Sequence, residues 1–195
     1  MQKPRTILTV AATILLQAAG IGQRAGNSAP SYATDGSLRL PADYRSWVYL
    51  SSGLGMTYDA NATPSTNPMF TNVFVNPEAY RAFLNTGTWP DKTVFMLEER
   101  ASETNVGPNR AGHFETDLRG VATLVKDETR FPEKWRFFIF DTKDGLPQGP
   151  ASPVKTKVCL DCHTKNGAVD HTFVQFYPTL KRVAIEKGTY KEPKQ

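Results

Sequence analysis

The stretch Trp135–Phe140 has the sequence Trp-Arg-Phe-Phe-Ile-Phe. Aromatic and β-branched residues favour a β-strand. However, a strand with one face in water alternates polar and apolar residues, and this stretch is apolar on both faces. One face must therefore meet the hydrophobic core, and the other must meet a helix or a bound group. The stretch thus predicts a sheet that is covered on both sides at this point.

Further strands are predicted before and around this one. They are indicated by segments rich in aromatic and β-branched residues, separated by polar loops with glycine or proline. These segments are residues 49–58, 70–75, 93–101, 114–127 and 135–141. Residues 144–153 are rich in turn formers. There is no internal repeat and no linker that divides the chain, so we expect one antiparallel sheet in one domain.

Three segments carry helix signals. A short helix is expected at residues 42–47. Asn76 followed by Pro77 has the residue types of an N-cap and a first helical position, so a helix begins there and ends near Gly87. Apolar residues recur at helical spacing between residues 170 and 185, where Pro178 leaves the start open. The predicted fold class is α+β, mainly β, with helices flanking the sheet and one helix at the C-terminal end.

The sequence Cys-Leu-Asp-Cys-His at residues 159–163 holds the only two cysteines of the chain. This is the C-x-x-C-H pattern of c-type haem attachment. Two thiols at this spacing can form thioether bonds to the two vinyl groups of one haem, and the adjacent histidine can ligate the iron. Cys159, Cys162 and His163 are therefore the predicted cofactor-binding residues, with His163 as the metal ligand of one covalently attached haem c.

Three other interpretations of the two cysteines explain less. A thioredoxin-like dithiol is expected in a βαβ pattern, which this sequence lacks. A zinc site needs about four ligands, and no second Cys or His pair has the required spacing. A structural disulfide leaves His163 unexplained.

Residues 1–33 have the features of a secretory signal peptide. Lys3 and Arg5 give a basic start, residues 7–19 are almost continuously apolar, and Ser31 and Ala33 are small residues at the positions that a signal peptidase inspects. The apolar run is shorter than the roughly 20 residues that span a bilayer, so we expect cleavage, at Ala33 or earlier, and no membrane attachment afterwards. The predicted location is the periplasm or the extracellular space, which agrees with haem c attachment.

The mature chain, residues 34–195, is long enough to enclose a cofactor in one domain. The formal net charge of the full sequence is +4, and three of its cationic residues, Lys3, Arg5 and Arg24, lie within the predicted signal. The mature surface is therefore close to neutral, which gives no indication of nucleic-acid binding. It also shows no lysine-rich face for docking an acidic redox partner.

The mature chain resembles the cytochrome P460 family and its relative cytochrome c′-β. The haem motif and Phe173–Leu180 are the most specific matches. The other matching stretches are Leu40–Val48, Val73–Tyr80, Thr86-Gly87, Asp91–Val94, Val125–Asp127, Arg130–Pro132 and Trp135 with Phe137 and Phe138. They occur in the same order over nearly the whole mature chain, so residues 34–195 are predicted to form a cytochrome P460-like haem c domain.

The resemblance implies an antiparallel sheet with flanking helices, a homodimer, and a five-coordinate haem with His163 on one side of the iron. The opposite, distal side is open to small molecules. P460 proteins carry a lysine bonded to the porphyrin and oxidise hydroxylamine, whereas the c′-β members lack this lysine and bind nitric oxide or carbon monoxide in an apolar pocket.

The positions that distinguish these subtypes carry other residues in this chain. The cross-linking lysine falls on Leu97, the family's distal arginine on Thr71, and its pocket carboxylate near Ala122. A one-residue slip of a strand would exchange its two faces. With Phe95 and Phe70, these residues form the predicted distal pocket.

An apolar distal pocket favours neutral diatomic ligands, because the polarity of the pocket decides what the iron does. Hydroxylamine oxidation instead needs a base close to the iron. The sequence therefore favours an exported mono-haem protein that binds a ligand such as nitric oxide, with a P460-type oxidoreductase, or a peroxidase-like one, as the alternative. Glu98, Glu99 and Glu115 keep the enzymatic alternative open, although carboxylates on strands usually face solvent.

A third alternative is an electron-transfer cytochrome with a sixth protein ligand and a redox partner protein. The remaining histidines, His113 and His171, are the nitrogen candidates, and Met56, Met69 and Met96 are the thioether candidates. His171 follows His163 too closely to reach the distal side. Met96 adjoins Leu97 on a strand and should point away from it, and methionines more often fill a core.

Overall fold

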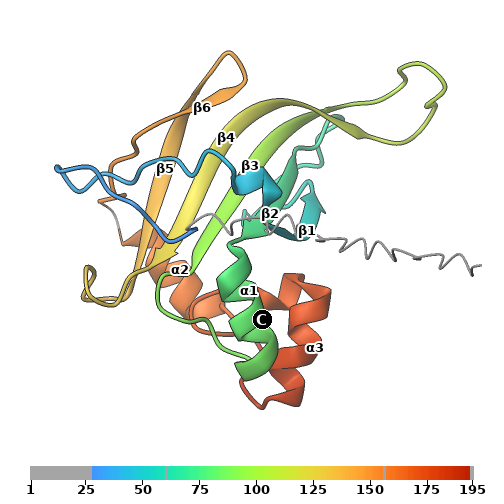
Figure 1. Cartoon of the computed structure of the whole chain (residues 1–195). Helices are drawn as coiled ribbons and strands as arrows, with labels where there is room; N and C mark the ends of the chain where they lie inside the picture. The colour runs from blue at the N-terminus through green and yellow to red at the C-terminus, as the bar shows by residue number, and fades with distance from the viewer. Residues whose placement is uncertain (1–27, 60, 156, 194–195) are drawn as a thin grey trace, which may run out of the picture.

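A computed structural model describes residues 28–59, 61–155 and 157–193. Six strands form one antiparallel sheet in sequence order, as Figure 1 shows. The strands are β1 (Val48–Leu54), β2 (Phe70–Val75), β3 (Val94–Glu103), β4 (Phe114–Lys126), β5 (Trp135–Lys143) and β6 (Leu146–Gln148). The helices are α1 (Pro77–Thr86), α2 (Val158–Asn166) and α3 (Pro178–Glu186), with 3-10 turns at Tyr44–Ser46 and Val174–Phe176. The predicted α+β, mainly β class with a C-terminal helix is confirmed.

Three local features differ from the sequence-based expectations. Part of the turn-rich segment forms β6, which pairs with the end of β5. The last helix begins only at Pro178, because the fixed φ of proline and its missing N–H suit a first helical position. The haem motif itself lies in helix α2, for which the sequence had given no secondary-structure prediction.

Helix α1 begins and ends where Asn76 and Gly87 predicted, but Asn76 acts differently from an N-cap. Its side chain makes no cap hydrogen bond. Its Oδ1 accepts from the backbone N–H of Val94 at 2.8 Å, and its Nδ2 donates to the carbonyl of Lys92 at 3.3 Å. Gly87 has φ 73° and ends the helix with an N–H···O bond to Phe83, a left-handed conformation that favours glycine. Asn76 thereby ties the start of α1 to strand β3.

Hydrophobic clusters cover both faces of the sheet. One contains Phe83, Trp89 and Tyr177 and packs the helices against the sheet. The other contains Trp47 and Phe138 and packs the N-terminal segment against the opposite face. Figure 1 shows the helices gathered near one end of the sheet and the blue N-terminal segment crossing the strands. The stretch 135–140 is divided between the two clusters, as its apolar character on both faces predicts.

The segment just after residue 27 packs on the domain. Tyr32 pairs with Leu38 as an isolated bridge, its hydroxyl donates to Asp127 at 3.1 Å, and the guanidinium of Arg130 lies 4.0 Å from its ring centroid. Packing therefore extends to the N-terminal side of the predicted boundary at Ala33. Most of the predicted signal peptide lies outside the described residues. No helix in the described ranges is long and apolar enough to cross a membrane.

Candidate haem site

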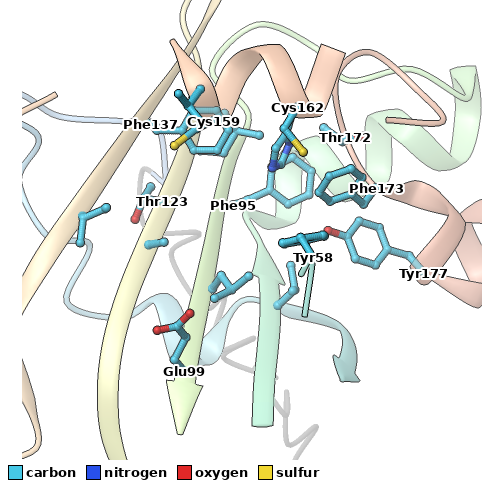
Figure 2. A pocket seen from close by; sticks show the side chains of 17 residues that line it. Tyr58, Phe95, Glu99, Thr123, Phe137, Cys159, Cys162, Thr172, Phe173 and Tyr177 are labelled. Atoms are coloured by element: carbon cyan, nitrogen blue, oxygen red, sulfur yellow. The ribbon is translucent and has the colours of Figure 1, made fainter. Parts of the chain in front are cut away.

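A cavity of about 500 Å³ opens between the sheet and helix α2. Figure 2 shows side chains from both converging on it. Strands β2 to β5 contribute Val73, Phe95, Leu97, Glu99, Ala122, Thr123, Leu124, Phe137 and Ile139. Helix α2 contributes Val158, Cys159, Cys162 and His163, and the segments outside the sheet contribute Tyr58, Thr172, Phe173 and Tyr177. The walls are mainly apolar, and the volume is in the range of a small-molecule or cofactor pocket.

Helix α2 brings the three predicted haem-binding residues to one wall of the cavity. Cys159 and Cys162 are three residues apart, so they lie on the same side of the helix. Both thiols are free and half-buried, and both line the cavity together with His163. An attached group would therefore be held along this wall.

His163 is oriented by its surroundings. Its Nδ1 lies 2.9 Å from the carbonyl oxygen of His171. A carbonyl only accepts, so Nδ1 carries the proton and Nε2 keeps its lone pair. The rings of Phe137 and Phe173 flank the imidazole, with centroids 4.8 and 4.2 Å away. These contacts fix both the tautomer and the ring plane.

The protonation state of His163 suits a metal ligand. Burial lowers the pKa of the imidazole below its ordinary value, and the hydrogen bond to the His171 carbonyl opposes this only in part. The neutral form, which alone offers a lone pair to a metal, is therefore favoured near pH 7.

Three of the five predicted distal residues line the cavity. Leu97 lies between Val73 on β2 and Ala122 on β4 in the strand register, and all three line the cavity with Phe95. Leu97 thus stands in a patch of apolar side chains.

The other two predicted distal residues lie elsewhere. Thr71 is on the same face of β2 as Val73, but its hydroxyl points to the Met56 sulfur, 3.9 Å away, and it does not line the cavity. Phe70 is three residues from Val73, so strand alternation directs it to the opposite face. The predicted pocket therefore extends too far along β2.

The three candidate carboxylates have different environments. Glu99 lines the cavity and is the one carboxylate among its described lining residues. Figure 2 shows it at the end away from the two cysteines. Glu98 is buried on the opposite face, where it pairs with Arg45 and Arg100. Glu115 accepts from Asn72 at 2.8 Å.

The candidate sixth ligands do not line this cavity. Met96 is fully buried on the other face of the sheet, with its sulfur 3.1 Å from the Thr123 hydroxyl. Met56 and Met69 are exposed. His171 supplies its backbone carbonyl on the His163 side, and His113 is the last residue of the β3–β4 loop.

Sequence reasoning missed several residues of the cavity. Tyr58 was placed in the predicted strand 49–58, but β1 ends at Leu54, and Tyr58 lies in the loop that follows. Phe173 and Tyr177 belong to the helix-like stripe whose start was left open at Pro178; they precede α3 and line the cavity. Phe137 could have been predicted as a cavity residue, because one face of the strand 135–140 was expected to meet a helix or a bound group.

The residues fit haem c. Two free thiols stand beside an oriented neutral imidazole at the wall of an apolar cavity of suitable volume. Fold and site together are those of a β-rich cytochrome whose Cys-x-x-Cys-His helix lies near the C-terminal end.

The family model of cytochrome P460 matches residues 41–174. The chain therefore belongs to the cytochrome P460 family, which implies a haem c-type cofactor. Members of this family are typically exported. A search of curated proteins gives no match.

Proposed function

We propose that the protein is an exported mono-haem c cytochrome that binds a small neutral ligand, such as nitric oxide, on the side of the haem opposite His163. The observation that carries this proposal is the apolar patch of Val73, Leu97 and Ala122 on the cavity wall formed by the sheet.

Covalent attachment needs only the two thiols and the haem vinyl groups. Cys159 and Cys162 would hold the haem by adding their thiols across its two vinyl double bonds, with sulfur on one carbon and hydrogen on the other of each. His163 would offer Nε2 to the iron, because the His171 carbonyl holds Nδ1. When bound, the haem would supply an iron centre for a small ligand.

The apolar patch selects among ligands by solvation. Side chains such as Leu97 and Val73 give no hydrogen bond to water or to an anion, so these species lose their solvation on entering the cavity. A neutral diatomic molecule loses little. The apolar walls therefore favour nitric oxide or carbon monoxide over water and hydroxide.

The first experiment is optical spectroscopy and mass spectrometry of the purified holoprotein. We expect the mass of one covalently attached haem, and a five-coordinate high-spin ferrous spectrum that changes on addition of nitric oxide. A low-spin spectrum with sharp α and β bands would indicate a sixth protein ligand and refute the proposal. A Soret band displaced far to the red would indicate a porphyrin cross-link and favour the P460-type enzyme.

The second experiment tests the patch directly. Leu97→Gln introduces a polar side chain that holds a water molecule in the cavity, which the ligand must displace. We expect the affinity for nitric oxide to fall roughly tenfold. Leu54→Gln, at an exposed leucine on strand β1, is the matched control. Equal affinities in both variants would show that the patch does not select the ligand.

A hydroxylamine oxidoreductase is the second candidate function, because Glu99 lines the cavity. Oxidation of hydroxylamine releases protons and electrons, so it needs a proton acceptor in the cavity and an external electron acceptor such as a redox partner protein. The assay measures hydroxylamine turnover with an artificial electron acceptor. Turnover that falls 10²-fold or more in Glu99→Gln would identify Glu99 as the base, whereas no turnover in the wild-type protein favours ligand binding.

A further inference from the structure

A tight turn lies directly behind His163. Val169 and Thr172 pair as an isolated bridge, with the N–H of Thr172 donating to the Val169 carbonyl at 2.8 Å. The two central residues, Asp170 and His171, have φ of 43° and 61°. Positive φ is unfavourable for residues that carry a Cβ, so the surroundings must hold this turn in place.

The turn carries the hydrogen-bond acceptor of His163. The His171 carbonyl oxygen lies 2.9 Å from Nδ1. The end of helix α2 touches the turn backbone to backbone at Gly167, where an added Cβ would lie 2.6 Å from the His163 carbonyl oxygen and 2.8 Å from the His171 carbonyl carbon. The position of the turn therefore sets the direction and strength of the hydrogen bond to His163.

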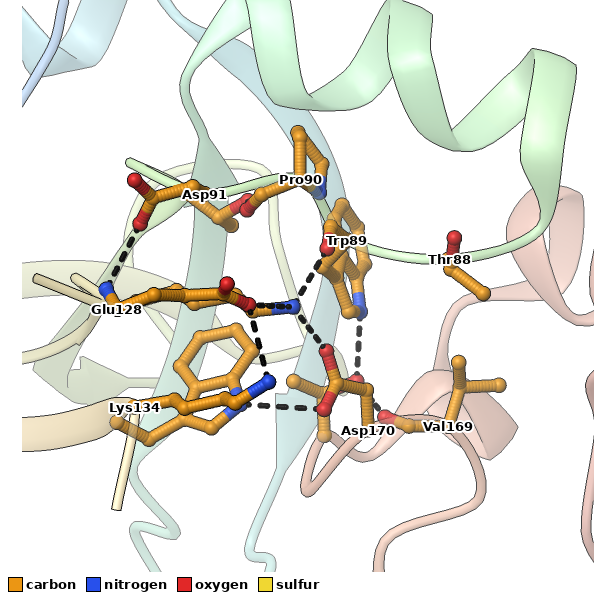
Figure 3. A network of polar contacts seen from close by, with 12 residues as sticks. Thr88, Trp89, Pro90, Asp91, Glu128, Lys134, Val169 and Asp170 are labelled. Carbon is orange, nitrogen blue, oxygen red and sulfur yellow. Dashed lines mark hydrogen bonds and ion pairs between the residues drawn. The ribbon is translucent and has the colours of Figure 1, made fainter. Parts of the chain in front are cut away.

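The sheet holds the turn through the side chain of Asp170. Lys126, the last residue of β4, is 7% exposed. Its Nζ lies 2.7 Å from Asp170 Oδ2 and 2.7 Å from the Trp89 carbonyl, and Trp135 Nε1 donates to Asp170 Oδ1 at 3.3 Å. Figure 3 shows dashed lines converging on the labelled carboxylate of Asp170.

A second anchor holds the other end of the turn. Trp89 Nε1 donates to the Thr172 hydroxyl at 2.8 Å, and this hydroxyl donates to the Val169 carbonyl at 2.6 Å. Trp89 and Thr172 are both buried. The buried residues Trp89, Trp135 and Lys126 thus all contact the turn Val169–Thr172. The same turn contacts the imidazole of His163 through the His171 carbonyl.

We propose that Lys126 and Asp170 are positioning residues for the haem ligand His163. Their ion pair fixes the strained turn, and the turn fixes the His171 carbonyl that accepts from Nδ1. A hydrogen bond at Nδ1 makes an imidazole more basic, which favours the more highly charged ferric iron. This proposal rests on the proposed function, in which His163 ligates the iron.

The test compares the midpoint potentials of the holoprotein in Asp170→Asn and Lys126→Met. Both changes loosen the turn, but one removes a negative charge and the other a positive charge. An effect through His163 raises both potentials, whereas an effect of charge through space shifts them in opposite directions. Mutation of a residue that supports a metal ligand typically has a 10- to 100-fold effect, and we expect the lower end, a roughly tenfold loss in the preference for ferric iron. For one electron this corresponds to a rise in midpoint potential of about 59 mV.

Further variants distinguish an effect on the position of His163 from an effect on the folding stability of the protein. Thr172→Val removes the anchor from Trp89 without a change of charge and should raise the potential as well, while Lys126→Arg should restore it. The iron–histidine stretching band of the ferrous protein should move to lower frequency in the three loosened variants. Lys143→Met, at an exposed lysine at the end of strand β5, is the control and should match the wild type.

Shifts of opposite sign in Asp170→Asn and Lys126→Met would overturn the proposal. So would variants that melt at lower temperature with an unmoved iron–histidine band. A wild-type protein without that band would refute the assignment of His163 as the ligand, and the proposal with it, so the two failures are distinguishable.

Discussion

Glu98→Gln should destabilise the protein substantially, although Glu98 lies on the face of the sheet away from the haem cavity. The carboxylate is 2% exposed. It accepts hydrogen bonds from Arg45 Nε at 2.7 Å, from Arg100 Nε at 2.6 Å and from the hydroxyl of Tyr44. Tyr44 and Arg45 hold β3 against the N-terminal segment, while Arg100 lies on β3 itself.

The size of the effect follows from these contacts. In Glu98→Gln, one carboxylate oxygen becomes an NH₂ group, which faces a donor instead of accepting from it. A hydrogen bond to a charged group contributes about 1.5–3 kcal/mol, and breaking a fully buried pair costs about 3–5 kcal/mol. Arg45 is half-exposed and can turn to water, so we expect a loss of about 2–3 kcal/mol, or roughly 5–10 °C in melting temperature.

The loss should depend on pH in a defined direction. Burial alone raises the pKa of Glu98, but the hydrogen bonds from Arg100, Tyr44 and Arg45 outweigh it, and the pKa lies below its ordinary value of 4.5. A lowered folded-state pKa gives stability that is present above the unfolded pKa and is lost as pH falls through the folded one. The difference in unfolding free energy between wild type and Glu98→Gln should therefore be full at pH 7 and shrink below about pH 4.5.

Urea unfolding of both proteins at several pH values measures this difference. Glu103→Gln, on the same strand and exposed, is the control and should change stability by less than about 0.5 kcal/mol. The reasoning is wrong if Glu98→Gln is as mild as the control, or if its effect is the same at pH 7 and pH 3.

Three further predictions concern the turn, the chain start and the helical layer. Gly167→Ala should destabilise the protein by about 1–3 kcal/mol, because the new Cβ meets the backbone at 2.6 Å; a thermal melt that matches the wild type would contradict this. On the proposed export, mass spectrometry should find a processed chain that still contains Tyr32, since Tyr32 packs on the domain; a chain starting at Thr34 would show that this packing is dispensable. Phe83→Ala should lower stability by about 3–5 kcal/mol while the haem spectrum is unchanged, because Phe83 is fully buried and does not line the cavity; a changed spectrum would show that the two regions are coupled.

The elements that the sequence predicted best are those with short-range signals. Strand β2 and helix α1 lie where residue types and the Asn76, Pro77 and Gly87 signals placed them. Strand β6 was missed because a three-residue strand has almost no period to detect. The function of the Asn76 side chain was misjudged because its partner, Val94, is distant in the chain.

The environments of Glu98 and Glu99 could not be predicted from the sequence pattern. Glu98 and Glu99 are adjacent in the sequence, and strand alternation says only that they point to opposite faces. The tertiary structure decides that the face of Glu99 is the cavity, whereas that of Glu98 meets two arginines.

The sequence by itself predicted Cys159, Cys162 and His163 as the haem-binding residues, because their signal is a spacing within five consecutive residues. It also determined most strands, since their signals are local. Only the tertiary structure decided which side chains line the cavity beside His163 and how Lys126 and Asp170 reach the turn that carries the His171 carbonyl. Those contacts join residues 44 positions apart, and nothing in the local chemistry of either residue specifies the other.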